Sequence, residues 1–126
     1  MNKLLSGRHV LVVEDEMMIL MFMEDMLADL GCESVTAAAT VDQALALIDE
    51  QNFDAVLLDM NLNGNKTCLI ADKLAACGTP FVFCTGNDHT IWKDHCDRAI
   101  LRKPFKYEEL EKILPHLSFP PIKGRA

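Results

Sequence analysis

The 126-residue sequence lacks several features that would assign it to a large class of proteins. It has no run of 18 apolar residues, so we expect no membrane-spanning helix and no membrane partner. Its first residues, Met1 to Gly7, lack the charged-then-apolar order of a secretion signal, which favours a cytoplasmic protein. No two of its five cysteines are spaced as Cys-x-x-Cys, so neither a zinc site nor a disulfide framework is expected.

Basic residues are also scarce. The chain has 12 Lys+Arg against 19 Asp+Glu, a formal net charge of -7, whereas a nucleic-acid partner would call for a basic surface. Hydrophobic residues make up 50% of the chain, which excludes a disordered acidic tail, and the length fits one domain. The surplus of carboxylates could serve solubility alone or could include a cation site.

Apolar β-prone runs alternate with segments of helical periodicity along the whole chain. Strands are predicted at His9–Val13, Ser34–Ala38, Ala55–Leu58, Pro80–Cys84 and Ala99–Leu101. Helices are predicted at Met17–Leu30, Val41–Ile48, about Lys66–Cys77, Thr90–His95 and Lys106–Leu117, with a polar loop at Asn61–Asn65. This alternation predicts an α/β domain with a parallel sheet that is covered by helices on both faces.

Polar residues whose side chains could bind a ligand or take part in a reaction follow four of the predicted strands. Glu14 and Asp15 follow the first strand, Asp59 the third, Thr85 the fourth and Lys103 the fifth. In open parallel sheets, ligands bind beyond the carboxyl ends of the strands, so these side chains should meet at one edge. The next acid along the chain, at position 16, is expected only to begin a helix.

These residue types suit phosphoryl transfer assisted by a metal ion. Carboxylates that are drawn together repel one another, and a hard cation such as Mg²⁺, which prefers oxygen ligands, removes that conflict. Asp59 could act as a nucleophile toward phosphorus and form an aspartyl phosphate. Lys103 and Thr85 could then contact the phosphoryl oxygens through a charge and a hydroxyl.

Four segments in register resemble the receiver domains of two-component response regulators, over about residues 7 to 117. They are Val12–Glu16, Val56–Gly64, Pro80–Gly86 and Leu101–Phe105. The resemblance implies a doubly wound (βα)5 sheet with strand order 2-1-3-4-5, the flavodoxin-like or CheY-like fold. It divides the chain into an N-terminal extension at 1–7, a receiver domain at 8–117 and a C-terminal tail at 118–126.

The resemblance also implies a metal site. Asp15 matches the acid that binds Mg²⁺ directly, and Glu14 matches the one that holds it mainly through water. Asp59 and the backbone carbonyl of Asn61 complete the expected ligands, and Mn²⁺ is a possible substitute for Mg²⁺.

The remaining implied roles concern the phosphoryl group. Asp59 matches the phosphoacceptor, Thr85 the switch hydroxyl and Lys103 the lysine that contacts the phosphoryl group. Ile100 stands where most of the family has a rotating Tyr or Phe. The run Phe83–Gly86 is partly similar to the Phe-Ala-Thr-Gly start of an atypical receiver group without that aromatic.

We therefore expect a stand-alone signalling receiver rather than an enzyme. The implied phosphoryl donor is a phosphohistidine on a histidine kinase or a histidine phosphotransfer protein, and output would pass through protein contacts or onward phosphotransfer. The protein would be a monomer or a weak homodimer.

The methionine-rich first helix would contribute to the core and could also form a docking surface. Phosphorylation is expected to draw Thr85 inward and to shift residues 86–97, and a cis bond before Pro104 is possible.

Two other readings remain as alternatives. A magnesium-dependent phosphohydrolase with an aspartate nucleophile would need a second Asp two residues after Asp59, where this chain has Asn61. A flavodoxin-like flavin-binding module would need hydroxyls and amides after the first strand, where Glu14 and Asp15 would repel a phosphate.

Overall fold

The computed structural model describes residues 4–62, 65–86, 100–103 and 105–117, which form a twisted parallel sheet between helices. The sheet has five strands in the order β2-β1-β3-β6-β7, and all neighbouring pairs run parallel. The strands are β1 (His9–Val13), β2 (Ser34–Ala38), β3 (Ala55–Asp59), β6 (Phe81–Thr85) and β7 (Ile100–Arg102). The predicted parallel sheet and its 2-1-3-4-5 order are therefore confirmed.

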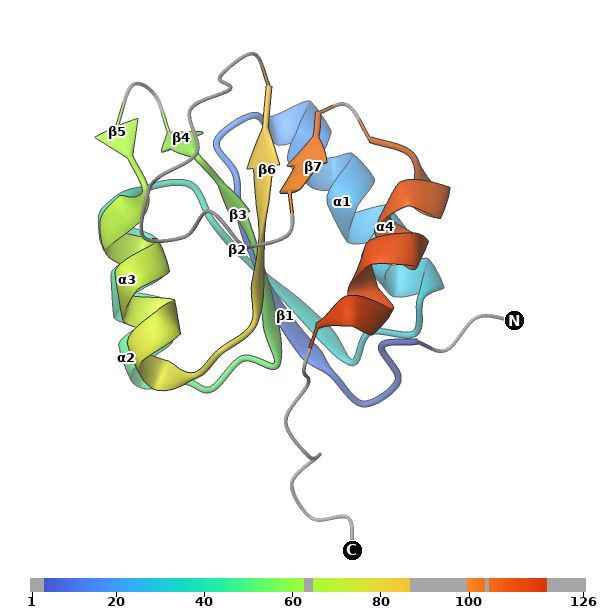
Figure 1. The fold of residues 1–126 in the computed structure, drawn as a ribbon, viewed down its shortest axis with the longest axis horizontal. Coiled ribbons are helices and arrows are strands. Elements are labelled where there is room, and N and C mark those ends of the chain that lie inside the picture. The colour runs from blue at the N-terminus through green and yellow to red at the C-terminus, as the bar shows by residue number, and fades with distance from the viewer. Residues whose placement is uncertain (1–3, 63–64, 87–99, 104, 118–126) are drawn as a thin grey trace, which may run out of the picture.

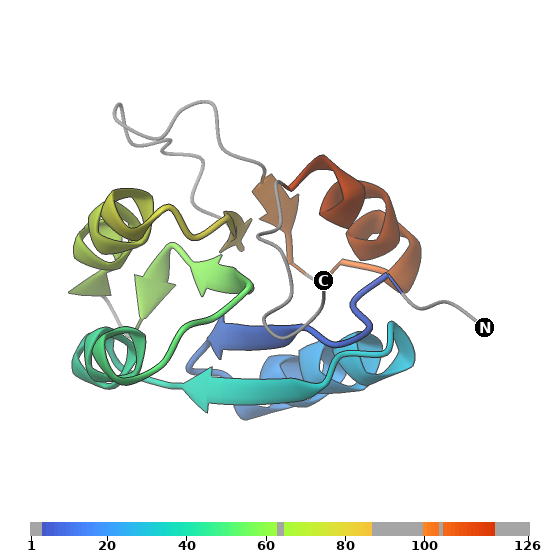
Figure 2. The ribbon, with the colours of Figure 1, turned by 90° about the horizontal axis from the view of Figure 1, so that it is seen from below.

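Helices cover both faces of this sheet. The helices α1 (Met17–Asp29) and α4 (Tyr107–Ile113) lie on one face, and α2 (Val41–Glu50) and α3 (Cys68–Cys77) lie on the other (Figures 1 and 2). A 3-10 turn, η2 (Leu114–His116), follows α4. None of the described helices is long and apolar enough to span a bilayer.

Alternation of side chains along the central strands builds two separate hydrophobic cores. On β1, Val10 and Val12 pack into the core under α1 and α4, whereas Leu11 and Val13 pack into the core under α2 and α3. The same period of two divides β3 and β6 between the cores, because successive side chains of a strand point to opposite faces. The central strands are buried on both faces, and this fixes the register in which their carboxyl ends meet.

The segment after β3 differs from the prediction. Residues 61–65 were expected to form a loop, but β4 (Asn61–Leu62) and β5 (Asn65–Lys66) pair as a short antiparallel hairpin. The following helix begins at Cys68 rather than at about Lys66, because Lys66 is used in that pairing. The buried side chain of Leu62 anchors the hairpin to the core, which a purely polar loop would not do.

Smaller differences occur near the C-terminal end of the fold. The last helix begins at Tyr107 instead of Lys106, and α4 passes into a 3-10 turn at Leu114, where the ring of Pro115 cannot continue an α-helical hydrogen-bond ladder. The predicted helix at Thr90–His95 and the bond before Pro104 lie outside the described residues.

One glycine provides a test of how helix α3 ends. Gly78 ends α3 in the left-handed backbone conformation, with φ of +74°, and glycine commonly takes this conformation at the end of a helix. Gly86 has no positive φ. A Cβ atom at either position would meet no atom within 4 Å, so only backbone strain distinguishes the two glycines. We expect Gly78→Ala to lower the free energy of unfolding by about 1–2 kcal/mol in urea denaturation, and Gly86→Ala to cause no loss. Equal effects of the two substitutions would contradict this account.

Candidate functional site

The residues predicted to act together lie at the carboxyl edge of the sheet. Glu14 and Asp15 directly follow β1, Asp59 is the last residue of β3, and Lys103 directly follows β7. The register places Val13 beside Leu58 and Asp59 beside Cys84, so neighbouring strands end at nearly the same level. Chain segments that are far apart in sequence are thereby brought to one point.

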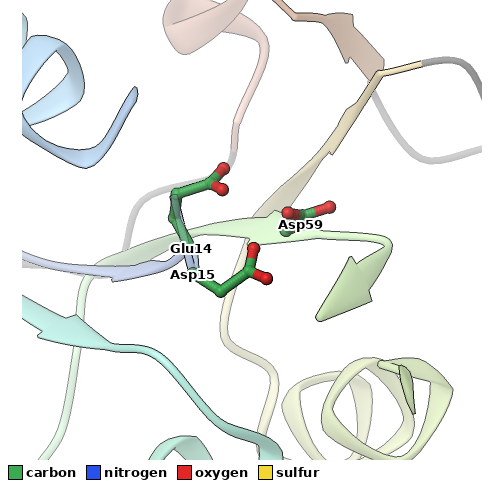
Figure 3. A group of neighbouring side chains, drawn as sticks. All are labelled: Glu14, Asp15 and Asp59. Carbon is green, nitrogen blue, oxygen red and sulfur yellow. The ribbon is translucent and has the colours of Figure 1, made fainter. Parts of the chain in front are cut away.

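Three carboxyl groups converge at this edge. Glu14, Asp15 and Asp59 each offer an oxygen, and these oxygens lie within 4.8 Å of one another. Figure 3 shows Glu14 and Asp15 extending from the end of β1 toward Asp59 at the end of β3. Glu14 and Asp59 are buried, whereas Asp15 is partly exposed, so the cluster opens to solvent on the side of Asp15.

Lys103 lies between two of these acids. Its Nζ donates a hydrogen bond to Oδ2 of Asp59 at 2.9 Å and another to Oε1 of Glu14 at 3.0 Å. The lysine side chain is only 8% exposed, so both contacts are largely shielded from water. Its backbone N–H also donates to the carbonyl of Thr85 at 2.7 Å, which fixes the start of the segment after β7 against the end of β6.

Burial and mutual repulsion make this cluster electrostatically strained. Burial, together with the nearby charge of Asp59, raises the pKa of Glu14 from 4.5 to about 6, although the Glu16 amide and Lys103 oppose that shift. Burial by itself lowers the pKa of Lys103. Its hydrogen bonds and charge interactions with Asp59 and Glu14 outweigh that effect and leave the pKa above its ordinary value. Lys103 therefore favours the charged form of Glu14 but does not outweigh the effect of burial on its pKa.

Thr85 and Asn61 flank the acid cluster. Thr85 is buried at the end of β6, the strand next to β3. Asn61 begins β4, two residues after Asp59, and the structure describes its backbone in the β4–β5 hairpin. The structure thus brings Glu14, Asp15, Asp59 and Lys103 into direct proximity, with Thr85 on the adjacent strand.

One buried polar residue near the site was not singled out by sequence reasoning. The hydroxyl of Thr67 donates a hydrogen bond to the backbone carbonyl of Asp59 at 2.6 Å, and the residue is fully buried. In the sequence, Thr67 lies just before an apolar helical segment, where a threonine is ordinarily read as a helix cap. Its contact with Asp59 depends on the hairpin, which the sequence did not reveal.

Comparison with known proteins decides the family. Residues 10–115 match the response regulator receiver domain. The chain belongs to this family. Receiver domains are phosphoacceptor modules of two-component signalling, they bind Mg²⁺ in their active site, and they interact with histidine kinases or phosphotransfer proteins.

Relatives of this receiver domain come from bacteria and fungi. The solution structure of SdrG from Sphingomonas melonis Fr1 is 39% identical with a TM-score of 0.80, covering 87% of this chain and 96% of that one. The receiver domain of the sensor histidine kinase PA1611 from Pseudomonas aeruginosa PAO1, with a magnesium ion coordinated in its active site cleft, is 29% identical with a TM-score of 0.75, covering 88% and 97%. The transcription factor SKN7 of Saccharomyces cerevisiae is 30% identical over 86% of this chain, which spans 18% of that protein.

The acid cluster of this receiver domain has the properties of a Mg²⁺ site. Its three carboxylates come from two strand ends and present the oxygen ligands that Mg²⁺ prefers. Burial, and after it the charge of Asp59, keep the pKa of Glu14 raised in spite of Lys103, and a further bound cation would favour its charged form. The residues that are present therefore fit a divalent cation.

Substitution of Lys103 measures how strongly the lysine offsets the two buried acids. In metal-free buffer at pH 7, we expect Lys103→Met to lower the free energy of unfolding by about 1–3 kcal/mol, because two buried carboxylates lose their charged hydrogen-bond donor. Lys73, which pairs with Asp49 at the surface, is the matched control, and Lys73→Met should cost less than about 1 kcal/mol. A cost for Lys103→Met no larger than that of the control would contradict the account.

Proposed function

We propose that this receiver domain accepts a phosphoryl group on Asp59 from a phosphohistidine of a histidine kinase or a phosphotransfer protein. The observation that carries the proposal is the position of Asp59 within the cluster, where Lys103 and two further carboxylates surround it. In the reaction, a carboxylate oxygen of Asp59 forms an O–P bond while the N–P bond of the donor breaks. The imidazole nitrogen keeps the bonding electron pair.

Residues of this chain have distinct parts in that transfer. Glu14 and Asp15, with Asp59 and the carbonyl of Asn61, would hold Mg²⁺, which supplies charge neutralisation for the attacking and phosphoryl oxygens. Lys103 is held 2.9 Å from Asp59 before transfer, so its ammonium group is already placed to bind a phosphoryl oxygen afterwards. Thr85, on the strand beside Asp59, provides the switch hydroxyl.

The donor would dock over helix α1, next to the acid cluster. Met17, Met18, Met21 and Phe22 expose much of their surface on this helix. Beside them, a cavity of about 210 Å³ is lined by Ile19, Phe22, Met23, Met26, Lys103 and Phe105. Flexible thioether side chains suit an adaptable contact with an apolar helix, and Lys103 lies at the boundary between this cavity and the site.

Signalling to binding partners would depend on a switch that has Ile100 in place of the Tyr or Phe found in most of the family. Ile100 begins β7, pairs with Phe83 of β6 and packs at the edge of the core under α2 and α3. An aliphatic side chain there cannot make the large ring rotation that the family generally couples to Thr85. We propose that phosphorylation moves Thr85 at the end of β6 and that binding partners recognise this change; the shift expected for residues 86–97 falls, after Gly86, outside the described residues.

Phosphorylation with a small-molecule donor tests the proposal directly. The protein is incubated with Mg²⁺ and acetyl phosphate and is then examined by intact-mass spectrometry. We expect one added phosphoryl group that is stable to acid and labile to base, because an aspartyl phosphate is an acyl phosphate. Omission of Mg²⁺ should reduce the yield strongly.

Two Asp→Asn variants serve as the test and its control. Asp59→Asn should abolish the adduct, whereas Asp49→Asn, at a largely exposed position on α2, should leave it unchanged. An adduct that persists in Asp59→Asn, or the absence of any adduct in the unmodified chain, would refute the assignment of Asp59.

A further inference from the structure

Thr67 is a buried polar residue that has no part in the candidate site as described so far. Among the residues that the structure describes, four polar or charged residues are buried, and three of them, Glu14, Asp59 and Thr85, belong to the candidate site. Thr67 is the fourth, and its exposed fraction is 0%. A hydroxyl that has lost its water needs a specific partner, so the partner indicates what the residue does.

The hydroxyl of Thr67 donates to β3, the strand that ends at Asp59, instead of capping its own helix. Thr67 occupies the cap position of α3, yet its side chain makes no cap hydrogen bond. On α2, by contrast, the hydroxyl of Thr40 accepts a hydrogen bond from the N–H of Gln43, as a capping threonine normally does. Thr67 forgoes that stabilisation and donates to the carbonyl of Asp59 at 2.6 Å.

Hydrogen bonds of Thr67 join the two ends of the segment that runs from Asp59 through the β4–β5 hairpin to α3. We call this pair of contacts, from Thr67 to Asp59 and Met60, the neck of the segment. Besides the side-chain bond to Asp59, the backbone N–H of Thr67 donates a longer bond of 3.4 Å to the carbonyl of Met60. Figure 1 shows β4 and β5 beside the end of β3 and the first turn of α3. Asn61 lies inside this closed segment and pairs with Lys66 across the hairpin.

We propose that Thr67 is a positioning residue that fixes the backbone at Asp59 and Asn61 and thereby sets the affinity of the site for Mg²⁺. This inference rests on the proposed function, because it assumes that these residues hold the cation. In this role Thr67 would contact neither the metal nor the phosphoryl group. Its hydroxyl holds the backbone that carries one carboxylate ligand and the expected carbonyl ligand, and residues that orient ligands in this way tune metal affinity.

Conservative substitutions separate this role from simple stability. Mg²⁺ dissociation constants are measured for the full, unphosphorylated chain from NMR titrations with MgCl2. Thr67→Val removes the hydroxyl at nearly constant size and should weaken Mg²⁺ binding about tenfold, whereas Thr67→Ser keeps the donor and should restore it to within about twofold. Ser34→Ala is the control, because it also loses a hydroxyl hydrogen bond, to His9, but lies at the amino ends of β1 and β2, at the edge of the sheet opposite the site.

The outcomes distinguish the inference from the proposed function. Equal Mg²⁺ affinity in the original chain, Thr67→Val and Ser34→Ala would overturn the positioning role alone. Failure of Thr67→Ser to restore binding would also overturn it. Failure of the original chain to bind Mg²⁺ would overturn both the inference and the metal site on which it rests.

A second measurement on the unaltered protein covers the case in which Thr67→Val does not fold. If opening of the neck disrupts the site, Mg²⁺ at ten times its dissociation constant should slow hydrogen exchange of the Thr67 amide about tenfold. The amide of Ala44, which donates to Thr40 in the first turn of α2, should be unaffected. Exchange of the Thr67 amide that does not respond to Mg²⁺ would contradict the proposal.

Discussion

The ammonium group of Lys103 between Glu14 and Asp59 is the interaction on which the functional edge of this domain depends. Two buried carboxylates next to a third would repel one another strongly in this setting, and a single lysine with 3.0 and 2.9 Å contacts reduces that repulsion without removing it. The remaining imbalance favours a divalent cation. The arrangement therefore holds a positive charge 2.9 Å from Asp59, where a phosphoryl group would arrive.

The sheet makes this interaction possible by bringing distant segments to one edge. Lys103 and Glu14 are separated by 89 positions in the chain, and Lys103 and Asp59 by 44. Parallel pairing of β1, β3, β6 and β7 brings all their carboxyl ends to the same side, and the two cores prevent any strand from slipping. The Lys103 amide, bonded to Thr85, ties the last strand to its neighbour at the level of the site.

The sequence predicted those parts of the fold that rest on long, continuous patterns. The strands His9–Val13 and Ser34–Ala38 were predicted with the observed bounds, and the first of them is an apolar, β-branched run that ends at the acids Glu14 and Asp15. The β4–β5 hairpin was missed, since two-residue strands contain no periodicity and the Asn and Gly residues of positions 61–65 are typical of a loop.

For the site, the sequence could predict which residues end each strand but not how they pair. Proximity of Glu14, Asp15, Asp59 and Lys103 followed from the rule that ligands bind at the carboxyl edge of a parallel sheet. The shared contact of Lys103 with two acids needed side-chain geometry. The role suggested for Thr67 needed it as well, because a threonine before a helix resembles an ordinary cap until its hydroxyl is located.

Titration of the Glu14 side-chain carboxyl by carbon-13 NMR tests the central claim most directly. In metal-free protein, this account predicts a pKa of about 6, above the ordinary 4.5, because Glu14 is buried beside Asp59. Saturating MgCl2 should lower that pKa, since a bound cation favours the charged carboxylate. A Glu14 carboxyl that titrates near 4.5 both with and without Mg²⁺ would contradict the claim that these residues form one coupled cation site.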